Sequence, residues 1–341
     1  METHPVVEHI ETAGGAQIFR MPLEAFPGLR TYVYLVLFKD YRVLIDSGSG
    51  FGGSNAELAE GFRQVKEFLI GESAQIEDLT HILITHGHID HIGGLNYLRP
   101  LSPAQLGIHE LDRRNITNYE ERLNLVSWNL ERYLIEAGVS SNRVDDLISL
   151  YRITKALFHS EKVDFTYEAI GMQLGPFEFL HVPGHCAGHV VIRLHNVLFS
   201  GDHILTDITP HQAPEHLTLS TGLEHYLHSL ELLKPWEKSV RLTLGGHKKP
   251  IFDLPARIVE IQQAYQERLK NVLDFFSTPN TINACSHSLF SEVHGYNILL
   301  ALEETGAHVE YLYERGLLGI DNLADLDKAN GPVPILYKQN S

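Results

Sequence analysis

The chain places three histidines and one aspartate within six residues, and this segment strongly constrains how the chain can fold. It contains His86, His88, Asp90 and His91, follows an apolar run at 80–85, and ends at a glycine pair. Zinc, iron and manganese accept imidazole nitrogens and carboxylate oxygens as ligands. Since a helix with this spacing cannot direct all four side chains to one point, we expect a tight loop that leaves a buried strand and holds a metal.

Four further polar residues each lie at the end of a predicted strand, beside glycine. They are Asp46, His185, Asp202 and His247, at the ends of predicted strands 42–46, 177–182, 197–200 and 239–244. Strands that end at one edge of a sheet bring such residues together, and glycine allows a close approach of the backbone. The pattern therefore predicts one site built from segments that are far apart in the chain.

Predicted strands alternate with helices in the first part of the chain, which indicates an α/β or mixed fold. Besides the strands above, we expect strands at 31–38 and 190–194 and helices at 54–71 and 223–233. Ser54 is the expected N-cap of the first of these helices. Each candidate residue then lies in a loop at a strand end, where functional residues gather.

Two segments have helical spacing instead. Residues 112–160 predict a helical hairpin, with helices at 119–137 and 143–158, which serves either as a packing element or as a lid that lines the substrate site. From residue 255 onward the pattern predicts helices at 257–276, 282–290, 294–305 and 309–315, and a hairpin of 317–320 with 334–337. We expect this last segment to form a compact second domain.

The composition favours an enzyme that acts on a small molecule in the cytoplasm. The formal net charge of −16 argues against a nucleic-acid partner, because nucleic acid is bound mainly through lysine and arginine. Two cysteines, Cys186 and Cys285, give no disulfide framework. No apolar run approaches the roughly 18 residues of a membrane span, and the polar, acidic start at 1–5 is unlike a secretory signal.

These motifs resemble those of the metallo-β-lactamase superfamily, in the order of that family and over most of residues 31–250. Stretches at 201–210, 257–269 and 301–308 are similar to the branch that includes β-lactamase-like protein 2, whose members carry a small winged-helix-like domain at the C terminus. The resemblance implies an α+β fold, a four-layer αββα sandwich. It implies a catalytic domain at 1–253, with the helical insert at about 112–160, and a C-terminal winged-helix-like domain at 254–341.

The resemblance also implies a centre of two divalent metal ions, zinc or else iron or manganese. In the family pattern, the ligands are His86, His88 and His185 for one metal and Asp90, His91 and His247 for the other, with Asp202 as the bridge. Asp90 and Asp46 are the implied catalytic carboxylates, and Asp46 orients a metal ligand without binding the metal itself. His88 stands where oxygen-reducing di-iron relatives have glutamate, and Asp202 stands where some β-lactamases have a cysteine ligand. Both chemistries are therefore disfavoured.

The expected activity is hydrolysis of a small ester-type substrate, a thioester or a lactone, by a hydroxide held between the metals. One alternative is a phosphodiesterase or endoribonuclease that cuts single-stranded RNA. The branch resemblance favours it, but residues 256–341 hold six basic against eleven acidic residues, which opposes it. Another alternative is a member of the fold that binds a ligand without turnover. Lys248, His211 and His189 are candidates for substrate contact, and the insert and C-terminal domain are candidate homodimer surfaces.

Overall fold

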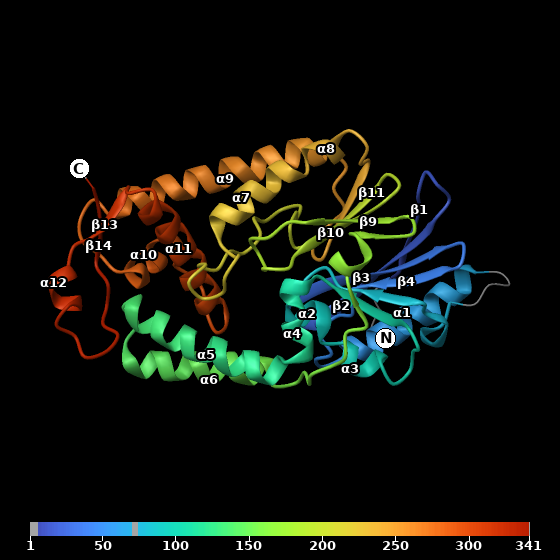
Figure 1. Cartoon of the computed structure of the whole chain (residues 1–341), viewed down its shortest axis with the longest axis horizontal. Helices are drawn as coiled ribbons and strands as arrows, with labels where there is room; N and C mark the ends of the chain where they lie inside the picture. The colour runs from blue at the N-terminus through green and yellow to red at the C-terminus, as the bar shows by residue number, and fades with distance from the viewer. Residues whose placement is uncertain (1–5, 70–73, 341) are drawn as a thin grey trace.

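The computed structural model describes residues 6–69 and 74–340, which form a two-sheet sandwich joined to a helical region (Figure 1). The polar start at 1–5 and the last part of the helix predicted at 54–71, residues 70–71, lie outside the described residues. Among the described helices, none has the length and apolar character needed to cross a membrane.

The sandwich is built from two sheets. The first has seven strands in sequence order: β1 (Glu8–Glu11), β2 (Gln17–Phe26), β3 (Leu29–Phe38), β4 (Tyr41–Ile45), β5 (His81–Leu83), β6 (Gln105–Ile108) and β7 (Phe165–Thr166). The second has five strands in the order β12-β11-β10-β9-β8: β12 (Leu242–Gly245), β11 (Val197–Gly201), β10 (Val190–Leu194), β9 (Phe177–His181) and β8 (Gln173–Leu174). Strands β4 to β7 pair in parallel, as do β11 and β12.

Helices cover the outer face of each sheet. Buried apolar residues of both sheets, such as Val43 and Phe199, form the core between them. The first sheet is covered by α1 (Ser54–Phe68), α2 (Ile89–Ile92) and α3 (Leu95–Leu98). The second is covered by α7 (Leu223–Leu232), α8 (Lys234–Glu237) and the first half of α9 (Leu254–Phe275). The predicted αββα sandwich is therefore confirmed.

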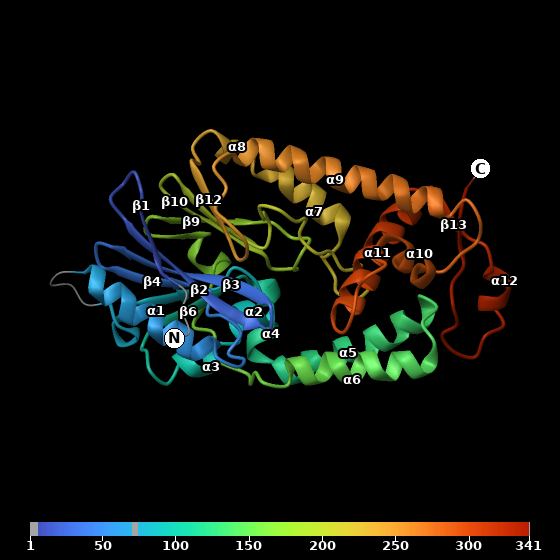
Figure 2. The same ribbon diagram turned by 180° about the vertical axis from the view of Figure 1, so that it is seen from behind.

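The helical insert and the C-terminal region share one apolar core. The insert consists of α4 (Arg114–Thr117), α5 (Tyr119–Glu136) and α6 (Ser141–Lys155). The C-terminal region adds α10 (Ile282–Leu289), α11 (Asn297–Glu314), α12 (Leu323–Leu326) and the hairpin of β13 (Leu318–Ile320) and β14 (Tyr337–Gln339). Leu134 of α5 and Leu147 of α6 belong to the same cluster as Val272 and Leu302. In both views α10 and α11 lie between α9 and the α5–α6 pair (Figures 1 and 2).

Two local predictions are wrong. The separate helices expected at 294–305 and 309–315 form one helix, α11. Gly306 does not end it, because this glycine packs against the insert: a Cβ there would lie 2.1 Å from the Tyr133 hydroxyl. Ser54 does not cap α1, since Gly53 occupies the cap position and the Ser54 hydroxyl is buried without a hydrogen-bond partner among the described residues.

Candidate metal centre

The strand ends bring together the residues that the sequence places after them. Asp46 follows β4, and His86 lies three residues beyond the end of β5, which runs parallel to β4. In the second sheet, His185, Asp202 and His247 follow β9, β11 and β12. These three strands point the same way, because β9 and β11 each pair antiparallel with β10, and β12 pairs parallel with β11. One edge of the sandwich therefore carries all five residues.

The cluster at 86–91 is a loop only in its first part, which corrects the expectation of a loop throughout. Ile89–Ile92 forms one helical turn, α2, with His88 in extended conformation just before it. Asp90 and His91 lie next to each other on this turn, with Asp90 Oδ2 3.7 Å from His91 Nε2. The turn therefore separates His86 and His88 from the Asp90–His91 pair.

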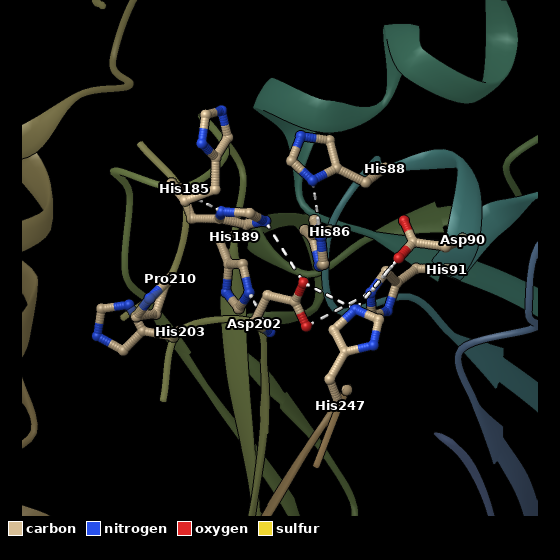
Figure 3. Close-up of polar contacts among 12 residues, drawn as sticks. His86, His88, Asp90, His91, His185, His189, Asp202, His203, Pro210 and His247 are labelled. Atoms are coloured by element: carbon tan, nitrogen blue, oxygen red, sulfur yellow. Dashed lines mark hydrogen bonds and ion pairs between the residues drawn. The ribbon is translucent and has the colours of Figure 1, made fainter. Parts of the chain in front are cut away.

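The seven predicted ligands form two groups, and within each group the donor atoms lie within 4.8 Å of one another. The groups are His86, His88 and His185, and then Asp90, His91, Asp202 and His247 (Figure 3). His86 Nε2 and His88 Nδ1 are 3.1 Å apart. Asp202 connects the groups, because its Oδ2 lies 3.7 Å from His185 Nε2 and 3.3 Å from His247 Nε2.

Three of the histidines donate from Nδ1 to an oxygen, which leaves Nε2 for the centre. The bonds run from His91 to Asp46 (2.8 Å), from His185 to the carbonyl of His211 (2.7 Å) and from His247 to the carbonyl of Arg30 (2.6 Å). Such bonds fix the tautomer and the ring orientation of a metal ligand. Asp46 also accepts the Thr85 N–H at 2.8 Å, so its carboxylate is itself held in place.

The donor atoms at the centre fit a metal. His91 Nε2, His185 Nε2 and Asp202 Oδ1 are buried and have no hydrogen-bond partner among the described residues. Leaving a buried polar atom unpaired costs free energy, so a group that pairs with all three would be stabilising. Imidazole with carboxylate is a donor set that suits zinc, iron or manganese. The number of ions and their identity stay predictions.

The two groups differ in charge when no metal is bound. Burial lowers the pKa of His86, His88 and His185, so these three rings are neutral at pH 7. Burial acts in the same direction on His91 and His247, but neighbouring carboxylates outweigh it. They raise the pKa of His91 well above its usual value and that of His247 to about 10. One half is thus an all-imidazole site, and the other pairs imidazolium with carboxylate.

Asp112 supports the centre, although its sequence context gives no sign of this. Its side chain is fully buried and accepts the N–H of Gly87 at 2.7 Å and that of Gly188 at 2.8 Å. Gly87 lies between His86 and His88, so one carboxylate ties the first histidine loop to the loop that carries His185. In the sequence, the glycines beside these histidines indicate that another group approaches the backbone there, but they do not indicate that this group is Asp112.

The three candidates for substrate contact lie in different surroundings. Lys248 is exposed directly after His247. His211 is half-buried and pairs with Glu303 at 3.0 Å. His189 is fully buried, where its ring stacks on His86 and its Nε2 accepts the Asp202 N–H at 3.1 Å. His189 therefore contacts two of the predicted ligands, His86 and Asp202, and helps to position them.

Comparisons with known proteins concern the family and the fold of the chain. A family model described as the metallo-beta-lactamase superfamily matches residues 27–274. The chain is 24% identical over 295 residues to the probable metallo-hydrolase YqjP of Bacillus subtilis, over 82% of this chain and 86% of that protein. It is 26% identical over 274 residues to the lactamase-like protein adaB of Aspergillus niger, over 80% of this chain and 65% of that protein.

Two solved structures have a similar fold along nearly the whole chain. The metallo-beta-lactamase family protein TTHA1429 from Thermus thermophilus has a TM-score of 0.74 and 24% identity, over 95% of this chain and 98% of that one. A beta-lactamase domain protein from Burkholderia ambifaria has a TM-score of 0.73 and 20% identity, over 99% and 96%. At these identities the likeness concerns the fold.

Proposed function

Because the chain belongs to the metallo-β-lactamase superfamily, we propose that it hydrolyses a small ester-type substrate, a thioester or a lactone, at a centre of two divalent metal ions, with zinc as the first candidate. The chain is a metallo-hydrolase of this superfamily with a His/Asp cluster that suits metal. The observation that carries the proposal is the pair of donor groups joined by Asp202, with buried unpaired atoms in both groups.

Different residues of the chain have different roles at such a centre. When bound, two divalent ions lower the pKa of water and polarise a carbonyl oxygen. Asp46 and the carbonyls of Arg30 and His211 accept hydrogen bonds from Nδ1 of their histidine partners, so that each Nε2 faces the centre and would be the atom that binds a metal once it is deprotonated. Asp90 is partly exposed and is the carboxylate of the centre best placed to meet a substrate.

A phosphodiester or single-stranded RNA substrate is the main alternative, and the charge of the chain opposes it. The net charge is −16, and the C-terminal region adds to the negative balance. Polyanions are bound chiefly through clusters of lysine and arginine. We therefore place the small ester first and treat RNA cleavage as a result that would overturn this choice.

The test begins with metal analysis of the purified protein. We expect close to two ions per chain, and a value well below one would contradict the proposal. The protein is then assayed with thioesters, lactones, bis-p-nitrophenyl phosphate and labelled single-stranded RNA. We expect turnover of a thioester or lactone, and at least a roughly hundredfold loss of kcat in Asp90→Ala and in His88→Ala. Cleavage of RNA alone, abolished in Asp90→Ala, would reject the ester substrate.

A further inference from the structure

The loop that carries His247 lies at the end of β12 in the second sheet, but residues of the first sheet hold it. Each residue from 245 to 248 is contacted by a side chain or a backbone group of β2 or β3. The contacting residues are Arg20, Arg30, Thr31, Tyr32 and Tyr34. The Tyr34 hydroxyl, for example, donates to the carbonyl of Gly245 at 2.5 Å. The direction of His247 therefore depends on the sheet opposite its own strand.

Arg20 of β2 makes the contact directly after His247. Its Nη2 donates to the carbonyl of Lys248, and its Nη1 pairs with Glu8 at 2.9 Å. Its guanidinium carbon lies 3.3 Å from the centre of the Tyr32 ring. A planar guanidinium can bind two acceptors and stack on a ring at the same time, which a lysine ammonium cannot do. Arg20 thus ties the edge strand β1, the hairpin of β2 and β3, and the His247 loop together.

The backbone of Lys248 has a conformation that needs such a contact. Its φ is +66°, in the left-handed region that few residues other than glycine, asparagine and aspartate adopt. A conformation of this kind persists only where the surrounding structure holds it. His247 Nε2 lies 3.2 Å from Asp90 Oδ2 and 3.3 Å from Asp202 Oδ2 (Figure 3). Because Lys248 adjoins His247, release of the Lys248 carbonyl would let His247 turn away from both carboxylates.

Strand pairing alone is the competing explanation for Arg20. Arg20 and Glu8 face each other across β2 and β1. The Arg20 side chain is 3% exposed, however, whereas that of Glu8 is 53% exposed. An ion pair with so exposed a partner contributes little, and burial of a guanidinium is costly unless its N–H groups are paired. The carbonyl of Lys248 supplies the second partner that this burial requires.

We propose that Arg20 is a positioning residue for the metal centre. Through the carbonyl of Lys248 it fixes the direction of His247, and it thereby sets the metal affinity of the donor group that contains His247. The all-imidazole group does not depend on it, because its histidines lie on the loops after β5 and β9, to which Arg20 makes no hydrogen bond within the described part of the chain. This inference rests on the two-metal centre of the proposed function.

The test measures metal affinity at one donor group at a time. The metal-free protein is titrated with Zn²⁺ in competition with a chelator. His88→Ala leaves the group with His247 intact, and His247→Ala leaves the all-imidazole group without its neighbour. In the His88→Ala background, we expect Arg20→Met to weaken Zn²⁺ binding by about tenfold or more. In the His247→Ala background, Arg20→Met leaves the affinity unchanged. A loss of equal size in both backgrounds, or in neither, would overturn the inference.

Control variants separate positioning from general stability. Arg193→Met removes a matched arginine of β10, which stacks on an aromatic ring and pairs with a glutamate at 2.6 Å, but which makes no hydrogen bond to residues 245–248 among the described residues. Glu8→Gln removes the ion pair of Arg20 and leaves its bond to Lys248. We expect neither variant to change Zn²⁺ affinity, and we expect Arg20→Lys to lose less affinity than Arg20→Met. An equal loss in Arg193→Met would mean that Arg20 acts on stability alone.

Hydrogen exchange in the metal-free protein separates failure of this inference from failure of the proposed function. Mass spectrometry follows the backbone amides of residues 242–249, and we expect exchange to be about tenfold faster or more in Arg20→Met than in wild type. If wild type binds no metal but this exchange rises, the two-metal centre is wrong and Arg20 still positions His247. Unchanged exchange refutes the inference. Should Arg20→Met not fold, Arg20→Lys decides: a loss of affinity confined to the His88→Ala background supports the inference, and any other result overturns it.

Discussion

At the scale of single residues, the centre depends on groups that touch the predicted ligands without being ligands. Gly246 is the clearest case. A Cβ at this position would lie 2.4 Å from Asp202 Oδ1 and 2.5 Å from His91 Cε1. The glycine therefore leaves the space that two predicted ligands occupy, His91 on helix α2 and Asp202 after strand β11.

Gly246→Ala is expected to displace Asp202 or His91 and to weaken metal affinity by about tenfold or more, since ligand placement sets affinity. Metal content after dialysis against a weak chelator measures this change. Gly53→Ala is the control, because a Cβ at that exposed position meets no atom within 4 Å. Full metal content in Gly246→Ala would show that the ligands adjust to the added methyl group.

Asp46 is the second case, because its carboxylate orients His91 and its backbone is in an uncommon conformation. Its φ is +61°, in the left-handed region that aspartate tolerates better than most residues. Asp46→Asn keeps the shape but can present an N–H to His91, and we expect metal affinity to fall by about 10- to 100-fold. Equilibrium competition with a chelator measures it, with exposed Asp40→Asn as the control. Unchanged affinity would mean that Asp46 has no part in holding His91.

At the scale of elements, α11 braces the loop that orients His185. Glu304 of α11 is 6% exposed, pairs with Arg268 of α9 at 2.6 Å, and accepts the N–H of Gln212 at 2.7 Å. Gln212 follows His211, whose carbonyl holds His185 Nδ1. The C-terminal region therefore contacts the loop beside the metal centre through two neighbouring carboxylates of α11, Glu304 at Gln212 and Glu303 at His211.

Glu304→Gln leaves the Arg268 guanidinium without its anion, and we expect the free energy of unfolding to fall by about 1–3 kcal/mol. This loss is smaller than the loss on breaking a fully buried ion pair, because Arg268 is partly exposed. Urea denaturation measures the loss. Glu314→Gln, an exposed change on the same helix, should leave the unfolding free energy within about 0.5 kcal/mol of wild type. If Glu304→Gln is as stable as wild type, Glu304 does not stabilise the contact of α11 with α9 and with the loop at Gln212.

The elements also show what the sequence could and could not reveal. Strand ends next to glycine located the centre, because apolar runs and glycine are local signals. Strand β2 escaped prediction, since buried Arg20 and Pro22 interrupt its apolar pattern. Arg20 is buried there because it bonds Glu8 and the carbonyl of Lys248, and Lys248 is far away in the sequence. The continuity of α11 was not predicted for a similar reason. A glycine is needed at 306 because the Tyr133 hydroxyl packs against it, and Tyr133 is far away in the sequence. Contacts of this kind are set by tertiary packing, which a single sequence does not display.

At the scale of the whole molecule, helix α9 belongs to two apolar cores. Ile258 and Ile261 pack in the core on the outer face of the second sheet, whereas Val272 packs in the core that the insert shares with the C-terminal region. The predicted boundary at residues 253–254 falls at the start of this helix. It stays a prediction, and the packing across it joins both parts of the molecule.

Stability of the whole molecule should fall in mild acid. Burial lowers the pKa of His109 to about 4 and that of His203 to about 3. Below about pH 6.5 these histidines therefore bind protons in the unfolded chain, whereas in the native state they stay neutral until the pH is much lower. Neutral His109 also accepts the Leu111 N–H on Nδ1. The free energy of unfolding therefore decreases as the pH drops from 6.5 toward 4.

The metal-free protein and His109→Asn are compared by urea denaturation at pH 7 and pH 5. Each buried neutral histidine of this kind contributes about 1–2 kcal/mol to the difference between the two pH values, so the drop should be smaller by that amount in His109→Asn. Exposed His287→Asn should retain the full drop. An equal drop in all three proteins would show that His109 is not neutral in the native state.

The shared core of the insert and the C-terminal region bears on how relatives of this fold could be recombined. Exchanging only the C-terminal segment between two such enzymes would set a foreign α10–α11 surface against a native α5–α6 pair, and mismatched packing would follow at Gly306 and Tyr133. A chimera that transplants both segments together keeps that interface matched. Laboratory shuffling of this scaffold should therefore treat them as a single inherited block, although more than a hundred positions of chain separate their midpoints.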